Sequence, residues 1–347
     1  IADANAEGGG RVVVPAGASQ NADGAYYSGA IRLLSNVNLH IDSGATIKFV
    51  RNPTNEYYPL VLTSYQGSDF YNYSPPVYAL GQTNIGLTGS GTLDAQYNVA
   101  NWRLPAGVPG AVSGSNAVLN DLDYRHVPNE QRIFSADGSM PATIPVIVGN
   151  TVQDLAPPPG AKAYKTTFTP QFVEFNHSSN ILIEGLNVIN SLFWQVHPLS
   201  SQNILIRNLN VYDTAHLTDD GIDPESCTNV VMESNSVTVR DDGTAIKSGR
   251  NLDGRYRDPS QNLIIRNSTF FNPNGGSAGI SAGSENSGSV INVFAENNTF
   301  GGDGTAYVLK IKMNAYRGGT VHDIYMRNST ITQTIRVIVN SDTNYSE

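Results

Sequence analysis

The sequence predicts an all-β protein built as a parallel β-helix, a single solenoid of stacked coils. Three observations lead to this fold class. A short strand-like pattern recurs along the chain, its copies mostly follow one another at 23 to 33 residues, and Gly, Asn or Asp turns separate its strands. Alternation of apolar and polar residues is typical of a strand with one buried face. Repeats of this length indicate stacked supersecondary units.

The copies start with NIGLTGSGTLDA at position 84 and continue from position 180 as NILIEGLNVINS, NILIRNLNVYDT, NVVMESNSVTVRD, NLIIRNSTFFNP, NVFAENNTFGG and DIYMRNSTITQT. The last six follow one another at intervals of 23, 26, 33, 30 and 31 residues. Each copy holds two or three short strands, a unit that resists fraying only when neighbours stack on it. The recurring Asn predicts a polar ladder at one turn, because Asn tolerates left-handed backbone geometry. A β-propeller would need four longer strands per repeat, and a sandwich would not repeat so regularly.

Two segments fall outside the repeat. The opening IADANAEGGGRVVVPAG predicts the end of a helix followed by a strand. Residues 101–170 are rich in Pro, Gly and polar residues. We expect loops there that border a cleft, not a second domain, because long structureless segments usually serve function. We therefore expect one domain over residues 1–347. The start at Ile1, and the pattern still running at the last residues, predict a chain trimmed at both ends.

Composition and charge exclude several classes of protein. The chain has 347 residues, of which 39% are hydrophobic and 15% charged, with 33 glycines, which fits a long all-β protein and excludes a disordered chain. The net charge of -9 argues against nucleic acid and anionic membranes as partners, and no apolar run reaches the length of a membrane helix. The single Cys227 excludes an internal disulfide framework and a cysteine-based zinc site. We expect an exported monomer, either secreted or periplasmic.

Polar side chains gather in four successive coils. They are Asp219, Asp220 and Asp223 in the first, Asp241, Asp242, Lys247 and Arg250 in the second, Ser277 in the third, and Lys310 and Lys312 in the fourth. The steps from Asp220 to Asp241, from Asp242 to Ser277 and from Ser277 to Lys310 are 21, 35 and 33 residues, so these side chains can stack in one column. With neighbouring strands about 4.8 Å apart, four coils span roughly 14 Å, enough for about three sugar residues.

Carboxylates on neighbouring coils suit glycoside hydrolysis. One carboxyl must be protonated to serve as the acid, and a nearby anion raises its pKa, while another activates water. Lysines one or two coils away suit the carboxylate of an acidic sugar. Three other readings compete: DDG as plain turn chemistry, a Ca²⁺ site made by the clustered carboxylates, and GISAG at 279–283 as a nucleophile elbow. The elbow needs a helix after the strand, and the sequence predicts none here.

The chain also carries, in this order, GGGRVVVPAG, GQTNIGLTGSGTLDAQ, SLFWQVHP, DGIDPESCTNV, DDGTAIKSGRNLDGR, GSENSG and RGGTVHDIYMRN. Together these stretches resemble the polygalacturonase family of glycoside hydrolases, family 28, and particularly its bacterial members. The resemblance covers nearly the whole chain except the insertion. It implies a right-handed parallel β-helix that hydrolyses pectic polysaccharides with inversion at the anomeric carbon, without a cofactor or a metal.

The resemblance implies roles for single residues. Asp241 is the general acid, and Asp220 and Asp242 hold and activate the water; inversion requires acid and base carboxyls about 6.5–9.5 Å apart. The family's Gly-His-Gly aligns with Gly276-Ser277-Ala278, so its histidine is missing. Its Arg-Ile-Lys aligns with Lys310-Ile311-Lys312, and a Lys offers a carboxylate a point charge where an Arg offers a planar fork.

We expect substrate binding by Thr218, which replaces the Asn of the family's first motif, and by His197, Lys247, Ser277, Lys310 and Lys312. His197 or His216 is a candidate to replace the missing histidine, although a buried structural role is favoured for both. Trp194 and Phe193 are candidates for stacking on sugar rings, with a core role equally favoured for Phe193.

The residues and the resemblance together predict an inverting glycoside hydrolase. Its expected partner is its substrate, an acidic polysaccharide that is pectic or related. A rhamnogalacturonan hydrolase stays open, because such members of the family also lack the histidine. Two other classes stay open as well. One is a carbohydrate-binding β-helix that has lost catalysis, as a tailspike or adhesin might. The other is a polysaccharide lyase on the same architecture, which would need Ca²⁺ and a cationic base.

Overall fold

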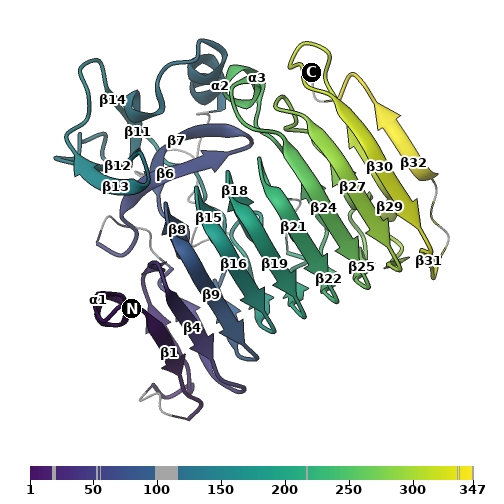
Figure 1. Ribbon diagram of the computed structural model, residues 1–347, viewed down its shortest axis with the longest axis horizontal. Helices are drawn as coiled ribbons and strands as arrows, with labels where there is room; N and C mark the ends of the chain where they lie inside the picture. Colours follow the sequence, from purple (N-terminus) through teal and green to yellow (C-terminus); the bar gives the residue numbers. More distant parts are fainter. Residues whose placement is uncertain are drawn as a thin grey trace.

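A computed structural model describes residues 1–17, 21–51, 54, 56–97, 116–215, 218–333, 335 and 337–345. Over these residues the chain forms a right-handed parallel β-helix, which confirms the predicted fold class. The coils stack side by side from the N-terminal to the C-terminal end (Figure 1). Each complete coil passes through three sheets, called here sheets B, C and A in chain order. A short helix, α1 (Ala2–Ala6), precedes the first strand, as predicted.

The strands of the three sheets are as follows. Sheet A contains β1 (Gly10–Val14), β4 (Val37–Ile41), β9 (Thr83–Gly89), β16 (Ser179–Glu184), β19 (Gln202–Arg207), β21 (Thr228–Glu233), β24 (Ser260–Arg266), β27 (Val290–Glu296) and β30 (Val321–Arg327). Sheet B contains β2 (Tyr26–Ser28), β5 (Thr46–Phe49), β10 (Thr92–Asp94), β17 (Asn187–Ile189), β20 (Asn210–Tyr212), β22 (Ser236–Thr238), β25 (Thr269–Phe271), β28 (Thr299–Gly301) and β31 (Thr330–Ile331). Sheet C contains β3 (Ile31–Arg32), β8 (Val77–Leu80), β15 (Val173–Asn176) and β18 (Val196–Leu199), and, beyond bridges at Ile222 and Glu225, β23 (Thr244–Ile246), β26 (Ser277–Ala282), β29 (Thr305–Lys312) and β32 (Val337–Asp342).

A continuous apolar core runs through the coils. In sheet A the residues Ile181, Ile204, Val230, Leu263 and Val293 lie in register on neighbouring strands, and all are almost fully buried. Burying one such side chain stabilises the fold by about 1.5–3 kcal/mol. The residues between them on each strand point outward and are half-buried or exposed. The alternation in the sequence therefore divides each strand of sheet A into an inner and an outer row.

The recurring asparagines form the predicted ladder. Asn180 Nδ2 donates to Asn84 Oδ1 at 3.0 Å, and Asn203 Nδ2 donates to Asn180 Oδ1 at 3.1 Å. Their backbones have φ values of 55° to 57°, in the left-handed region that Asn tolerates. The same bond repeats at Asn229, Asn262 and Asn292. The ladder marks the start of the sheet A strand in each coil.

The insertion is not the set of loops that we expected. In the described part of the segment, 116–170, the chain forms α2 (Asn116–Tyr124), η1 (Asn129–Gln131), β11 (Arg132–Ser135), β12 (Ile144–Val148), β13 (Thr151–Leu155) and β14 (Lys162–Lys165). Strands β11 and β14 join a small sheet with β6 (Leu60–Tyr65) and β7 (Ser68–Tyr73). The first part of the predicted insertion, 101–115, lies outside the described residues. The described part of the insertion contributes to a compact apolar cluster of Phe70, Leu119, Leu122, Phe134 and Phe168, which explains why it forms regular elements.

The hairpin β6–β7 lies over the outer face of sheet C. Thr63 Oγ1 donates to Glu174 Oε2 at 2.9 Å, and Gln171 Nε2 donates to the Ser64 carbonyl at 2.6 Å. The helix α3 (Asn251–Arg255) packs beside α2 at the same end of the coils (Figure 1). This cover buries outward-facing residues of sheet C that an isolated β-helix would expose. In the described ranges, the helices are all too short or too polar to cross a membrane.

Candidate active site

The three predicted catalytic aspartates lie in neighbouring coils, just before the chain enters sheet C. The Gly221 amide donates to the Asp242 carbonyl at 3.0 Å, and the Gly243 amide donates to the Ala278 carbonyl at 2.9 Å. These bonds stack the segment after Asp220 directly on the segment after Asp242. The predicted column is therefore present for the aspartates of the first two coils, whereas Lys310 lies in register with Ser281 and not with Ser277.

The glycines of the two DDG sequences are required by close packing of the coils. A Cβ atom on Gly221 would lie 2.5 Å from the Gly243 carbonyl oxygen, and one on Gly243 would lie 2.7 Å from the Gly279 carbonyl oxygen. Neither backbone has a left-handed φ. Close packing, and not a left-handed turn, therefore accounts for these glycines, because they let one coil approach the next.

Asp242 is held as an anion by four donors. Its Oδ1 accepts bonds from Ser277 Oγ at 2.6 Å and from the Ala278 amide at 3.0 Å. Its Oδ2 accepts bonds from Ser281 Oγ at 2.5 Å and from the ammonium of Lys312. Burial alone would raise the pKa of Asp242, but Lys312 and the hydroxyl donors hold that pKa at about 2. Asp242 is therefore ionised at any pH near neutral.

Asp241 has the opposite protonation behaviour. Burial, reinforced by the nearby charges of Asp220 and Asp242, raises the pKa of Asp241 to about 7. Its side chain is partly exposed, unlike that of Asp242. Its backbone amide donates to Asp219 Oδ1 at 2.9 Å, which fixes the loop that carries it. A partly exposed carboxyl that keeps its proton up to neutral pH has the properties of a general acid.

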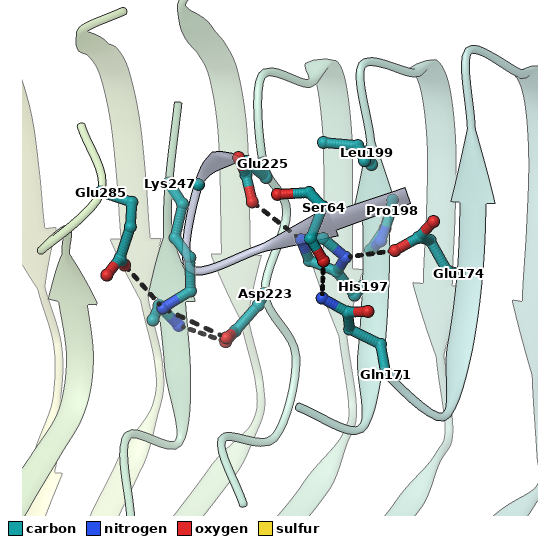
Figure 2. A network of polar contacts seen from close by, with 12 residues as sticks. Ser64, Gln171, Glu174, His197, Pro198, Leu199, Asp223, Glu225, Lys247 and Glu285 are labelled. Atoms are coloured by element: carbon teal, nitrogen blue, oxygen red, sulfur yellow. Dashed lines mark hydrogen bonds and ion pairs between the residues drawn. The ribbon is translucent and has the colours of Figure 1, made fainter. Parts of the chain in front are cut away.

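Asp220 belongs to a buried cluster around Lys247. The Lys247 ammonium lies 3.2 Å from Asp220 Oδ2, 3.4 Å from Asp223 Oδ2 and 3.4 Å from Glu285 Oε2, and Figure 2 shows it between the last two. It also lies 3.8 Å from the centre of the Trp194 ring. Burial and then the charge of Asp223 raise the pKa of Asp220 well above its usual value, while Lys247 opposes the shift.

Two predicted substrate-binding residues are corrected by their burial. Lys247 is only 3% exposed and is surrounded by carboxylates of its own chain, so it acts on Asp220 and not on a ligand. His197 is fully buried, with Nδ1 3.1 Å from Glu174 and Nε2 3.0 Å from Glu225 (Figure 2). Burial would lower the pKa of His197, but the two glutamates raise it. Its role is structural, and His216 lies outside the described residues.

The two lysines of the fourth coil differ in availability. Lys312 is buried against Asp242. Lys310 is partly exposed, with its ammonium 4.6 Å from the Tyr307 ring centre and 4.7 Å from that of Tyr345. Among the residues that the structure describes, no carboxylate lies within ion-pair distance of Lys310. Lys310 is therefore the cation of this motif that can receive a carboxylate from a ligand.

The structure buries both aromatic candidates, which makes the prediction of sugar stacking wrong for Trp194 and selects the core role for Phe193. Trp194 is 4% exposed and Phe193 is 1% exposed, and their rings stack on each other. Phe193 also stacks on Tyr65 of the covering hairpin. These rings form the floor beneath Lys247 and present no face to a sugar. Thr218 is partly exposed beside Asp219. Its contact with a ligand stays a prediction.

Comparisons with known proteins agree with this geometry. The family model described as glycosyl hydrolases family 28 matches residues 151–347. The chain belongs to this family. A solved structure of an exopolygalacturonase from Thermotoga maritima is 32% identical, with a TM-score of 0.80, over 99% of this chain and 72% of the other.

Two curated relatives complete the comparison. This family 28 chain is 38% identical over 168 residues to a probable polygalacturonase of Vitis vinifera, an alignment that covers 47% of this chain and 33% of the relative. It is 26% identical over 328 residues to an endo-polygalacturonase of Pectobacterium carotovorum subsp. carotovorum, over 92% of this chain and 66% of the relative. The chain thus spans between one third and two thirds of the length of these relatives.

Two functional residues of this family 28 chain, Ser281 and Glu285, were missed from the sequence. Ser281 donates to Asp242, and Glu285 flanks Lys247 together with Asp223, which the sequence analysis named without a role. A signal for Ser281 was present, because it lies four residues after Ser277 and therefore on the same face of β26. It belongs to the GISAG sequence, and no helix follows β26 among the residues described there, so the elbow was rightly set aside. Across the described ranges, no set of three or more His, Cys, Asp or Glu residues is arranged to hold a metal.

Proposed function

We propose that this chain is an inverting glycoside hydrolase that cleaves an acidic, pectic-type polysaccharide. One observation carries the proposal: a partly exposed carboxyl that keeps its proton, Asp241, adjoins a carboxyl that is held ionised, Asp242. Glycoside hydrolysis by two carboxyls requires one of them protonated and the other ionised at the same bond. Membership of family 28 supports the assignment.

The proposed reaction uses these groups in separate roles. Asp241 donates its proton to the oxygen of the departing sugar as the glycosidic bond breaks. Asp220 and Asp242 hold the attacking water on the opposite face of the ring, and the ionised Asp242 accepts its proton. The new bond forms from the water oxygen to the anomeric carbon, which inverts its configuration. Lys247 opposes the rise in the pKa of Asp220 without cancelling it, so Asp242, which is held ionised, is the base of the pair.

The acidic nature of the substrate follows from Lys310. Its ammonium is partly exposed next to the carboxylate column, which suits a sugar carboxylate bound beside the broken bond. The relatives with the highest similarity cited above are named polygalacturonases, which supports a pectic polymer. Because such a polymer is found outside cells, we also propose that the protein is secreted or periplasmic.

A rhamnogalacturonan-type hydrolase is the second candidate, and one observation favours it. Ser277 stands where the resemblance places a histidine, and its hydroxyl is used by Asp241 and Asp242. The reaction chemistry would be the same, and only the sugar beside the broken bond would differ.

Product analysis on a panel of pectic, rhamnogalacturonan and algal acidic polysaccharides tests both candidates. The parent should release reducing sugar on one of them, and Asp241→Asn should lower the rate by about 10²–10⁴-fold. Proton NMR of the first product should show the inverted anomer. A binding protein without catalysis would bind a polymer and release nothing, and a lyase would give products that absorb in the ultraviolet. Either result would refute the hydrolase assignment.

A further inference from the structure

The outer face of sheet A carries three straight columns over six neighbouring strands, β16, β19, β21, β24, β27 and β30, which lie side by side in Figure 1. The asparagine ladder, with Asp323 at the corresponding position of β30, forms the first column. The second, called here the apolar column, contains Leu182, Leu205, Val231, Ile264, Phe294 and Tyr325. The third, the charged column, contains Glu184, Arg207, Glu233, Arg266, Glu296 and Arg327.

The apolar column is open to solvent. Phe294 is 44% exposed and Tyr325 is 51% exposed, and their rings stack with centres 4.8 Å apart. The other four members are partly exposed. A sheet with one face in water normally alternates apolar-in and polar-out, so an apolar row at the centre of the outer face departs from that pattern. Rows of this kind, rimmed by polar residues, mark interaction surfaces.

The charged column alternates strictly in sign. Arg207 Nε lies 2.8 Å from Glu184 Oε1. In the pairs Arg266–Glu233 and Arg327–Glu296, the Arg Nη2 atom lies 2.6 Å from the Glu Oε2 atom. The column has six positions, an even number. When it is read in reverse order, every Glu is therefore replaced by an Arg and every Arg by a Glu. The column is complementary to itself turned end to end.

We propose that this face of sheet A pairs with the same face of a second copy of the chain. The two-fold axis would run parallel to the strands and pass midway between β21 and β24. This rotation reverses the order of the strands but leaves each column opposite itself. Glu184 then faces Arg327 of the second copy, Arg207 faces Glu296, and Glu233 faces Arg266.

The same rotation matches the apolar column. Val231 faces Ile264 of the second copy at the centre, and each aromatic ring faces a leucine, Phe294 against Leu205 and Tyr325 against Leu182. A two-fold axis along the solenoid would instead place the charged column against the asparagine ladder. Only the axis parallel to the strands satisfies both columns, and a homodimer has self-complementary patches of this kind.

The size of the face sets the strength of the dimer. Six strands about 4.8 Å apart and three columns about 7 Å apart give a face on the order of 400–500 Å² per copy. A standard stable interface has about 800 Å² per copy. We therefore expect a weak dimer that forms at micromolar protein concentrations, in place of the monomer expected from the sequence. The inference is independent of the proposed reaction, since the aspartate column lies at sheet C.

Charge exchange within the column tests the geometry sharply. The end exchange, Glu184→Arg with Arg207→Glu, keeps that ion pair within the chain but puts like charges opposite each other at four contacts of the dimer. The centre exchange, Glu233→Arg with Arg266→Glu, keeps every contact between copies complementary. A four-residue variant that adds Glu296→Arg and Arg327→Glu to the end exchange restores complementarity.

The number of like-charged contacts within one chain ranks the three variants differently from the number between copies. The centre exchange is therefore a matched control for the end exchange. The end exchange creates one like-charged pair between neighbouring strands, whereas the centre exchange and the four-residue variant each create two. If the exchanges acted by destabilising the single chain, the end exchange would therefore have the smallest effect of the three variants. Exposed ion pairs contribute little to stability, so all three variants should fold, and thermal unfolding checks this.

Sedimentation velocity over a concentration series measures the association. We expect the end exchange to weaken the dimer at least tenfold, the centre exchange to leave it within about threefold, and the four-residue variant to recover it, since only the end exchange puts like charges opposite each other. A parent that stays monomeric up to about 100 μM would overturn the proposal. So would equal effects of the end and centre exchanges, or a four-residue variant that fails to recover the dimer.

Discussion

The Ser277 hydroxyl oxygen lies 2.6 Å from Oδ1 of Asp242 and 2.9 Å from Oδ1 of Asp241. A hydroxyl has one proton, so it can donate to only one of the two carboxyls at a time. Asp242 is the ionised member and the closer one, and it receives the stronger bond. Ser277 thus occupies the point at which the proposed acid and its anionic neighbour meet.

Replacing Ser277 should move the pH dependence of catalysis. The bond from Ser277 lowers the pKa of both Asp241 and Asp242. In Ser277→Ala both pKa values should rise, so the profile of kcat/KM against pH should shift upward by several tenths of a unit, with a loss of rate. Ser277→Thr keeps the hydroxyl and serves as the control. An Ala profile that coincides with the parent would show that the hydroxyl does not tune the pair.

Stability should decline as the pH rises from about 5 to 8. Burial is the main cause that raises the pKa of Asp123 and Asp223 to about 6, of Asp69 and Asp241 to about 7, and of Asp219 to about 8. These groups bind protons more tightly in the folded protein than in the unfolded chain, whose Asp pKa is about 3.9. Unfolding therefore releases protons in this range. The stabilising contribution is complete below pH 4 and is lost as the pH passes each folded pKa.

Thermal unfolding in a series of buffers measures the decline, and Asp219→Asn is the informative variant. The amide keeps the oxygen that accepts bonds from the amides of Arg240 and Asp241 but cannot ionise. We expect a smaller fall in Tm between pH 6 and 8 than in the parent. An equal fall in both proteins would mean that Asp219 is already ionised when folded.

A second loss of stability should occur at low pH. Burial alone would raise the pKa of Glu225, but Arg257 and His197 hold it at about 2, and Lys312 and hydroxyls do the same for Asp242. A pKa lowered on folding gives stability that is present above the unfolded pKa of about 4 and lost as the pH falls towards 2. The protein should therefore be most stable at mildly acidic pH. Denaturant unfolding at pH 3, 5 and 8 locates the maximum, and a maximum at pH 8 would contradict the expectation.

Removing the Lys247 ammonium should destabilise the protein strongly. Lys247→Met would leave Asp220, Asp223 and Glu285 buried with no cation between them, a change that costs about 3–5 kcal/mol when one partner of a buried ion pair is lost. The double variant Lys247→Met with Glu285→Gln should recover part of that loss. Urea unfolding measures both. A single variant within about 1 kcal/mol of the parent would show that these carboxyls are neutral when folded.

Lys310 should affect substrate affinity without affecting stability. Its ammonium is partly exposed and has no ion-pair partner in the described ranges, so Lys310→Met should leave Tm unchanged. KM for a polymer with free carboxylates should rise about tenfold, as for a lost charged hydrogen bond of about 1.5 kcal/mol. The same polymer with methyl-esterified carboxyls should show no difference, and Lys310→Arg should retain affinity. An equal rise in KM on both polymers would point to a role other than charge recognition.

The sequence by itself determined the repeat, the inner and outer rows of each coil, and the column of Asp220, Asp241 and Asp242. Alternation and repeat length are regularities of the local sequence, so they can be recognised without knowing which distant residues are in contact. The same regularity would have revealed Ser281, which shares a face of β26 with Ser277.

Only the tertiary structure decided which outward-facing residues remain accessible. His197 was a candidate to replace the missing histidine and Lys247 a candidate to bind a sugar carboxylate, but the hairpin β6–β7 and the folded insertion cover the face of sheet C on which they lie. Thr63 reaches Glu174 across 111 positions of the chain, and Lys312 reaches Asp242 across 70. Burial and pKa depend on such distant partners, and no local pattern in the sequence encodes them.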